Sequence, residues 1–138
     1  MTLDDHDLTK GFNSLIGIEY QEVTADRCVA VLDADERHHQ PLGLVHGGVY
    51  CALVEATGSA GAAAHAHERD IGALVGIANS TDFYRPHRTG RIVAVATPLH
   101  QGRSQQVWQV EITRSDDGKL LARGQLRVHH LLDANTLA

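Results

Sequence analysis

The sequence predicts an α+β fold in which an antiparallel sheet of five to six strands wraps around one long central helix. Three observations support this prediction: a long apolar helix covers residues 48–67, a hairpin pattern precedes it, and four strand-like runs follow it. With 138 residues, the chain has room for one domain with a sizeable core. Because no linker, repeat or low-complexity segment divides it, we expect residues 1–138 to form a single domain.

The elements before the long helix follow from the spacing of apolar residues. Residues 7–16 have the spacing of a short amphipathic helix. Residues 17–35 alternate apolar and polar side chains on both sides of a turn at 24–27, which predicts a hairpin. Residues 36–48 contain Pro41 and three glycines, so we expect a loop that leads into the long helix.

Strand patterns dominate the second half of the chain. The long helix ends in a run of small residues, which allows other backbone to pack closely against it. Asp116-Asp117-Gly118 is a typical hairpin turn between the last two strands. The four runs that we expect to form strands are 71–84, 90–102, 104–115 and 118–132.

The composition narrows the classes of partner. With 43% apolar and 21% charged residues, the chain is typical of a globular protein. A net charge of −5, the lack of a basic run and an aromatic content of 4% argue against nucleic-acid binding. No stretch approaches 18 uninterrupted apolar residues and the N-terminus is acidic, so we expect no membrane segment, no signal peptide and a cytoplasmic location.

Neither the cysteines nor the histidines indicate a metal site. Cys28 and Cys51 form no CxxC motif, and we expect both to be buried thiols in a reducing compartment. The ten histidines include close pairs, but these pairs lack the i, i+4 spacing that places two imidazoles on one helix face. Nucleotide-cradling glycine motifs are missing as well. We therefore expect no metal and no cofactor.

Glu55 is the residue that most strongly indicates chemistry. It stands in an apolar stretch of the long helix, where burial of a carboxylate is costly unless the group is paired or used. A solvated helix position is the plain alternative. Two features favour a catalytic role for Glu55. Ser59 lies one turn later, and Gly47-Gly48 begin the helix with unpaired N–H groups and the positive end of its dipole. Oxyanion-stabilising N–H groups together with a carboxylate base or nucleophile suit ester or thioester hydrolysis.

Residues 38–59, HHQPLGLVHGGVYCALVEATGS, resemble the active-site segment of hotdog-fold acyl-CoA thioesterases. The resemblance is to the branch similar to the phenylacetate-pathway and enterobactin-associated enzymes, and it covers residues 11–131. It implies a hotdog fold, hydrolysis of acyl-CoA, and homodimers that often pair into homotetramers. The motif consists of Gln40, His46, Gly47, Gly48, Glu55 and Ser59.

The resemblance also implies a role for each residue of the motif. Glu55 would be the general base or nucleophile, and the Gly47 N–H would polarise the thioester carbonyl. Gln40 and His46 would orient the carbonyl or the attacking water, and Ser59 would assist near Glu55. His46 would alternatively serve as a helix cap alone. The further substrate-binding residues that we expect are Gly48, Phe83, Tyr84, Arg85, Arg88 and Arg103.

The substrate contacts outside the motif are less specific. The three arginines lie where such proteins often meet the nucleotide end of coenzyme A, although Arg85 and Arg88 also resemble ordinary surface charges. Several relatives carry a polar residue or histidine where this chain has Phe83 and Tyr84. The aromatic pair favours an aromatic or hydrophobic acyl group.

Two other functions fit the same fold. A hotdog dehydratase acting on hydroxyacyl thioesters would pair a loop histidine with the helix carboxylate, but it usually carries Pro-Gly where this chain has His46-Gly47-Gly48. A non-catalytic acyl-CoA-binding module would have no use for Glu55. Gly47 and Glu55 are also about 12 Å apart along one helix. Since a reacting carbonyl must lie about 3 Å from both groups, we expect each site to combine two subunits.

Overall fold

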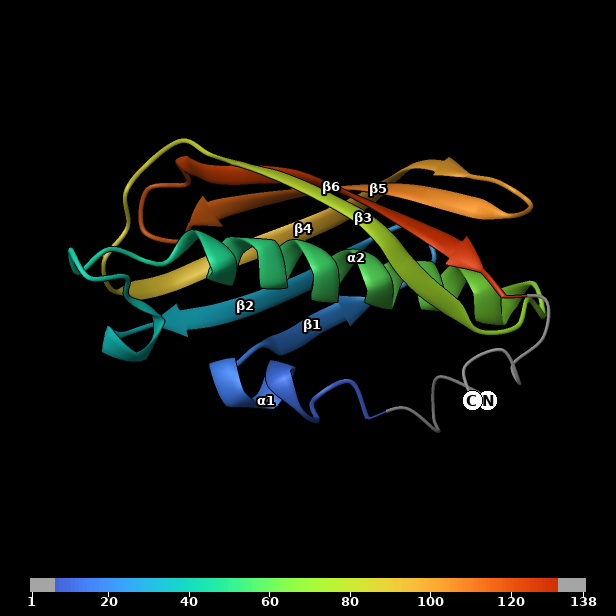
Figure 1. The fold of residues 1–138 in the computed structure, drawn as a ribbon, viewed down its shortest axis with the longest axis horizontal. Helices are drawn as coiled ribbons and strands as arrows, with labels where there is room; N and C mark the ends of the chain where they lie inside the picture. Colours follow the sequence, from blue (N-terminus) through green and yellow to red (C-terminus); the bar gives the residue numbers. More distant parts are fainter. Residues whose placement is uncertain (1–6, 132–138) are drawn as a thin grey trace.

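The computed structural model describes residues 7–131, which form one curved sheet packed on a long helix (Figure 1). The strands are β1 (Glu19–Val23), β2 (Cys28–Ala34), β3 (Leu74–Phe83), β4 (Gly90–Gln101), β5 (Gln105–Arg114) and β6 (Leu120–His130). The helices are α1 (Phe12–Ile16), the 3-10 turn η2 (Glu36–His38) and α2 (Gly47–Glu68). The sheet order is β1-β2-β4-β5-β6-β3 with antiparallel neighbours throughout. This arrangement confirms the predicted hotdog fold.

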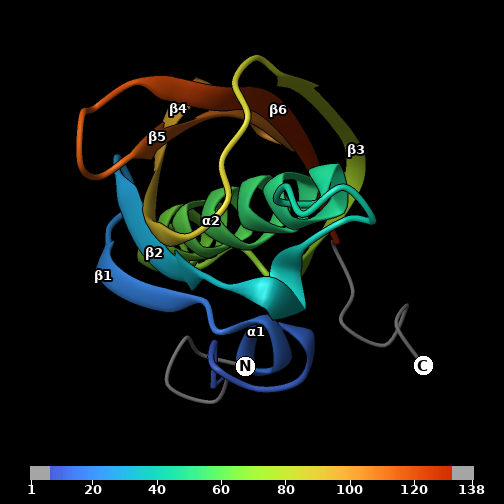
Figure 2. The same ribbon diagram turned by 90° about the vertical axis from the view of Figure 1, so that its left-hand side faces the viewer.

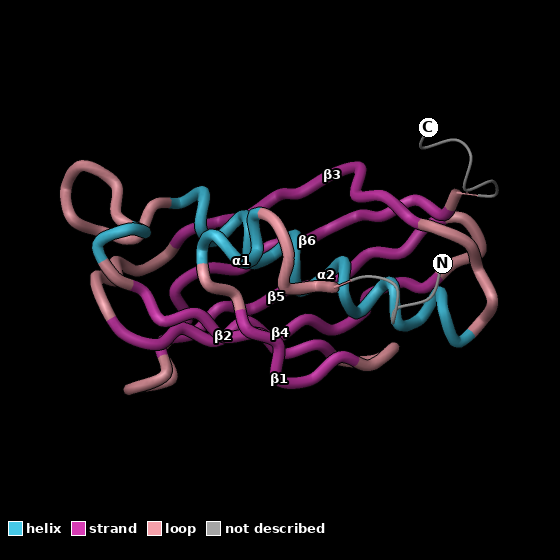
Figure 3. The backbone as a smooth tube through the Cα atoms, turned by 90° about the horizontal axis from the view of Figure 1, so that it is seen from below, coloured by secondary structure: helices cyan, strands magenta, loops and turns pink. Residues whose placement is uncertain are grey.

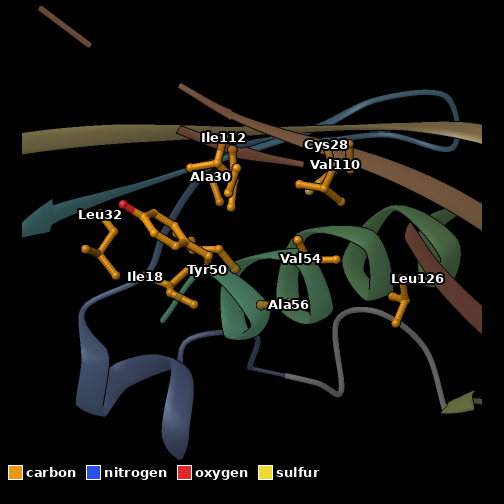
Figure 4. Close-up of a cluster of buried hydrophobic side chains, with 14 of the residues drawn as sticks. Ile18, Cys28, Ala30, Leu32, Tyr50, Val54, Ala56, Val110, Ile112 and Leu126 are labelled. Atoms are coloured by element: carbon orange, nitrogen blue, oxygen red, sulfur yellow. The ribbon is translucent and has the colours of Figure 1, made fainter. Parts of the chain in front are cut away.

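Helix α2 is buried over most of its surface because the sheet curves around it (Figure 2). A helix that is apolar all round is stable when packing partners cover it. Its small residues let the strands approach: a Cβ at Gly61 would overlap the ring of Trp108, and one at Gly58 would overlap Leu126. Trp108 is fully buried. Apolar side chains such as Val54 fill the space between α2 and the sheet (Figure 4).

Helix α1 is shorter than the predicted 7–16. It begins at Phe12 and ends at Ile16. Gly11 and Gly17 flank it with φ angles of 65° and 80°, a left-handed conformation that favours glycine and interrupts a right-handed helix. Leu8 still packs against the core from outside the helix, which explains the apolar spacing of this segment.

Two smaller expectations are also corrected. Cys28 is buried, but Cys51 is half-buried, because it lies where α2 meets β3, the last strand of the sheet among residues 7–131. The segment before α2 is more ordered than a plain loop. Asp35 caps the turn η2, and a bridge joins His39 to Val45.

The sheet ends at β1 on one side and at β3 on the other. Strand β3 pairs with β6, and no strand among the described residues pairs with its outer edge. Ile77, Phe83 and Tyr84 are about half exposed along and just after this edge. On the side of α2 away from the sheet, α1 lies in front of the long helix when the molecule is viewed from below (Figure 3). Within residues 7–131, no helix has the length and apolar character needed to cross a membrane.

Candidate active site

Helix α2 begins at a histidine cap. His46 Nδ1 accepts a hydrogen bond from the Gly48 N–H at 2.8 Å, so His46 does cap the helix. In a neutral ring this leaves the proton on Nε2, and because the side chain is exposed, that N–H can still meet a substrate. The Gly47 N–H donates to no acceptor among the described residues. It lies at the positive end of the helix dipole, where a carbonyl oxygen would be stabilised.

Gln40 lies in a tight turn just before the cap. Its N–H donates to the Leu44 carbonyl at 2.7 Å, and its own carbonyl accepts from the Gly43 N–H at 2.9 Å. The side-chain Oε1 accepts from the Leu42 N–H. Since Oε1 is held inside the turn, the Nε2 group is the part of Gln40 left to donate to a substrate or water.

Phe83 comes from the end of β3 and packs on the start of α2. A Cβ at Gly47 would lie 2.6 and 2.7 Å from two atoms of the Phe83 ring, so a larger residue there would force this half-exposed ring or the start of α2 to shift. The ring centroids of Phe83 and Tyr50 are 5.8 Å apart. Burial raises the pKa of Tyr50 to about 12, so its hydroxyl is neutral. Phe83 therefore contacts the glycine motif directly, while Tyr84 follows it on the exposed surface.

Glu55 lies two turns further along α2, and its side chain is exposed in the single chain. The apolar sequence around it suggests burial, but the sheet covers the other sides of the helix. On the open side, Asn79 Nδ2 donates to Glu55 Oε2 at 3.3 Å. Ser59, one turn later, is half-buried and lines the same cleft as Glu55. The structure thus brings these two residues together, as their spacing predicts.

The cleft has a volume of about 730 Å³ and follows α2 from Glu55 toward the end of the helix. Its floor consists of small helix residues, and its walls come from α1, β1 and the start of β3. The Tyr20 hydroxyl donates to the Ala56 carbonyl at 3.3 Å, and burial raises the Tyr20 pKa, so Tyr20 brings no charge to the cleft. The cleft offers a mainly apolar surface beside the Glu55 carboxylate, although Asp7, Lys10, His67 and Asp70 also line it. Its apolar lining includes Ala52, Ala56, Ala60, Ala63, Phe12, Tyr20, Ile71 and Leu74.

The three arginines expected to meet coenzyme A lie at opposite ends of the sheet. Arg85 and Arg88 are between β3 and β4, near the start of α2, where Arg88 Nη1 donates to the Gly43 carbonyl at 3.1 Å. Arg103 is in the turn between β4 and β5, beyond the other end of β4. Strand β4 has 12 residues. At about 3.3 Å per residue it spans roughly 40 Å, so the two groups cannot meet one nucleotide on the same chain.

Asn79 is a residue of this region that the sequence did not indicate. It lies in the middle of β3 and reaches α2, where its Nδ2 also donates to the Cys51 carbonyl at 3.0 Å. No motif marks it, because its position depends on which face of β3 meets the helix. The one sequence feature that could have indicated Asn79 is its polar amide within a predicted strand that also contains many apolar residues.

The fold is that of a hotdog thioesterase, in which a curved antiparallel sheet holds one long helix. The site fits this class, because an N–H without an acceptor among residues 7–131 lies at the start of the helix and a carboxylate lies beside an apolar cleft. Residues 42–121 match the family model of the thioesterase superfamily. The chain belongs to this superfamily, and it is a thioester hydrolase.

Individual relatives agree with this assignment. Rv1847 of Mycobacterium tuberculosis, named as an esterase, is 41% identical over 125 residues, which cover 90% of this chain and 89% of the relative. Its solved structure has a TM-score of 0.84 at 42% identity and covers 87% of this chain and 95% of that one. The proofreading thioesterase EntH of Cronobacter turicensis is 39% identical over 97 residues, 70% of this chain and 69% of EntH. The 1,4-dihydroxy-2-naphthoyl-CoA hydrolase of Listeria monocytogenes is 35% identical over 103 residues, 75% of this chain and 82% of that one.

Proposed function

We propose that the protein hydrolyses acyl-CoA thioesters to a free acid and coenzyme A, and that the acyl group is aryl or of medium size. The apolar cleft beside Glu55 carries this proposal, since a volume of about 730 Å³ accommodates such a group. The Listeria relative, named as a naphthoyl-CoA hydrolase, supports the same class of substrate. Arg85 and Arg88, or Arg103, would hold the phosphates of coenzyme A.

The proposed reaction needs an attacking oxygen and a site for the oxyanion. Glu55 either removes a proton from water or attacks the carbonyl carbon itself. The carbonyl oxygen becomes negative in the tetrahedral intermediate, and the Gly47 N–H stabilises it. Collapse of the intermediate breaks the C–S bond and releases the coenzyme A thiolate, which takes up a proton. If Glu55 acts as base, this step yields the free acid directly; if Glu55 is the nucleophile, it leaves a mixed anhydride on Glu55, which water then hydrolyses to the free acid and the carboxylate. Gln40 and His46 orient the carbonyl or the water, and Ser59 assists Glu55.

We also propose that each site combines two chains. Gly47 and Glu55 lie eight residues apart on α2, about 12 Å along its axis, whereas one carbonyl must lie about 3 Å from both groups. In an antiparallel pair of α2 helices, Glu55 of one chain lies beside Gly47 of the other, which creates two equal sites.

The edge strand β3 supports such a dimer. Its outer backbone groups have no strand partner among residues 7–131, and Ile77 and Tyr84 beside it are about half exposed. A second copy that added its own β3 would continue the sheet and bring the two α2 helices side by side. Two dimers then pair into the homotetramer that the resemblance implies.

Thiol-release assays test the activity and the role of Glu55. The wild type is expected to release free thiol from members of a panel of aryl and aliphatic acyl-CoA esters. Glu55→Ala is expected to lower kcat at least about 100-fold while the protein stays folded. Near-wild-type turnover in this variant would remove Glu55 from the mechanism. Single turnover in ¹⁸O-labelled water tests the nucleophile role. Unlabelled oxygen in the first acid product would come from Glu55, through an anhydride that water opens at the Glu55 carbonyl, whereas attack of water on the acyl carbon, as in general-base catalysis, labels the acid.

Subunit mixing tests the shared site. Glu55→Ala and Gln40→Ala, each nearly inactive alone, are co-refolded in equal amounts. In a mixed dimer one site collects both lesions and the other is intact, so random exchange should restore roughly a quarter of wild-type activity. If both residues served the same site from one chain, no activity would return, even with subunit exchange verified independently.

A further inference from the structure

The Asn79 side chain joins the edge strand β3 to α2. Its Nδ2 donates to Glu55 Oε2 at 3.3 Å and to the Cys51 carbonyl at 3.0 Å. Thr81 Oγ1 donates to Asn79 Oδ1 at 2.8 Å. Because a hydroxyl hydrogen occupies the amide oxygen, the amide nitrogen faces α2, and its two hydrogens match the two acceptors there.

A bulge in β3 makes this arrangement possible. The register with β6 shifts between Gly76 and Ala78, so Ile77 is an extra residue. Gly76 and Asn79 are three residues apart and would face opposite sides of a regular strand. With the bulge both face α2: a Cβ at Gly76 would overlap Glu55 Oε1, while Asn79 bonds Oε2. Bulges commonly re-aim side chains beside active sites.

We propose that Asn79 is a positioning residue that orients the Glu55 carboxylate for attack, supported by Thr81 and by the space at Gly76. The inference rests on the proposed role of Glu55 as base or nucleophile. Glu55 is exposed in the chain and would otherwise sample several rotamers. The Asn79 donor holds Oε2, which leaves Oε1 for water or substrate. Orientation of this kind contributes strongly to rate, since a displacement of about 1 Å can cost about 100-fold.

Variants at Asn79 separate orientation from binding. Asn79→Leu keeps the approximate size but removes the donor, and we expect kcat to fall about tenfold or more while KM stays within about twofold. Asn79→Asp keeps the shape but places a second carboxylate beside Glu55. Its activity should be low near neutral pH and recover in part in acid, where a shared proton restores the hydrogen bond. Thr81→Val should lower kcat less than Asn79→Leu does.

Ser80→Ala is the matched control. Ser80 lies between Asn79 and Thr81 and is exposed, so by strand alternation it faces away from α2. We expect its kcat and KM to equal those of the wild type. If kcat fell as much in Ser80→Ala as in Asn79→Leu, the effect would reflect a general weakening of β3, and the proposal would be overturned.

A double-mutant cycle with Glu55→Gln decides between positioning and a merely structural role. If Asn79 acts through Glu55, Asn79→Leu should cause no further loss in the Glu55→Gln background. An equal loss in both backgrounds, or wild-type kcat in Asn79→Leu alone, would overturn the proposal. If Asn79→Leu does not fold, Thr81→Val enters the same cycle with the same two outcomes. High activity of Glu55→Gln by itself would instead overturn the proposed function, so the two failures are distinguishable.

Discussion

Replacing Gly47 with alanine tests whether Phe83 shapes the oxyanion end of α2. The variant keeps the backbone N–H, and Gly47 has no positive φ that would exclude alanine. The new methyl carbon would lie 2.6 Å from the Phe83 ring. Because ordinary carbon contacts are about 3.5–4 Å, the ring or the start of the helix must move by about 1 Å. A displacement of that size near the reacting carbonyl can cost up to about 100-fold, so we expect kcat/KM to fall about 10- to 100-fold.

Stability and a companion variant make this prediction specific. Alanine is a better helix former than glycine by up to about 1 kcal/mol, so Tm should stay near the wild-type value while activity falls. Phe83→Ala removes the ring that the methyl group meets. In the double variant the methyl group has space, and thiol release should return to the level of Phe83→Ala alone. The bulkier Gly47→Val should be more severe than Gly47→Ala.

Two results would refute this reasoning. Wild-type turnover in Gly47→Ala would mean that the contact with Phe83 yields without disturbing the carbonyl site. A double variant clearly less active than Phe83→Ala alone would mean that the methyl group acts on something other than the ring. In the second case the oxyanion role of the Gly47 N–H would survive, but the part played by Phe83 would not.

Removing the charge of the arginine that binds coenzyme A should raise KM far more than it lowers kcat, and this loss of affinity should shrink at high salt. Steady-state kinetics of Arg85, Arg88 and Arg103 variants check this prediction. An unchanged KM in all three variants would place the nucleotide elsewhere. Burial lowers the pKa of His65 from 6.5, so below about that pH the unfolded chain binds more protons and stability should fall. Thermal melts across that range should show the decline in the wild type and a weaker one in His65→Gln. Ala63→Leu adds bulk to the cleft, so it should exclude the longest acyl groups while short acyl-CoA esters react normally. If the dependence of activity on acyl chain length is unaltered, the acyl group lies outside the cleft.

Local sequence patterns determined most of the fold. The long helix, the first hairpin and the four later strands follow from apolar periodicity and turn residues, and each of these signals involves residues close together in the chain. The proximity of Glu55 and Ser59 also follows from local sequence, because residues four apart share a helix face. The late start of α1, at Phe12 instead of residue 7, followed from the positive φ of Gly11, which apolar spacing does not report.

Tertiary structure decided how these parts meet. Glu55 is exposed because the sheet covers the other sides of α2, and the sequence of the helix does not say which side remains open. Asn79 reaches Glu55 because one extra residue in β3 reverses the strand's alternation, and that shift exists only relative to β6. Arg88 and Arg103 both lie in turns beside strand ends, yet the whole length of β4 separates them. Period and turn signals depend on near neighbours, whereas exposure, register and distance depend on segments that contact one another only after folding.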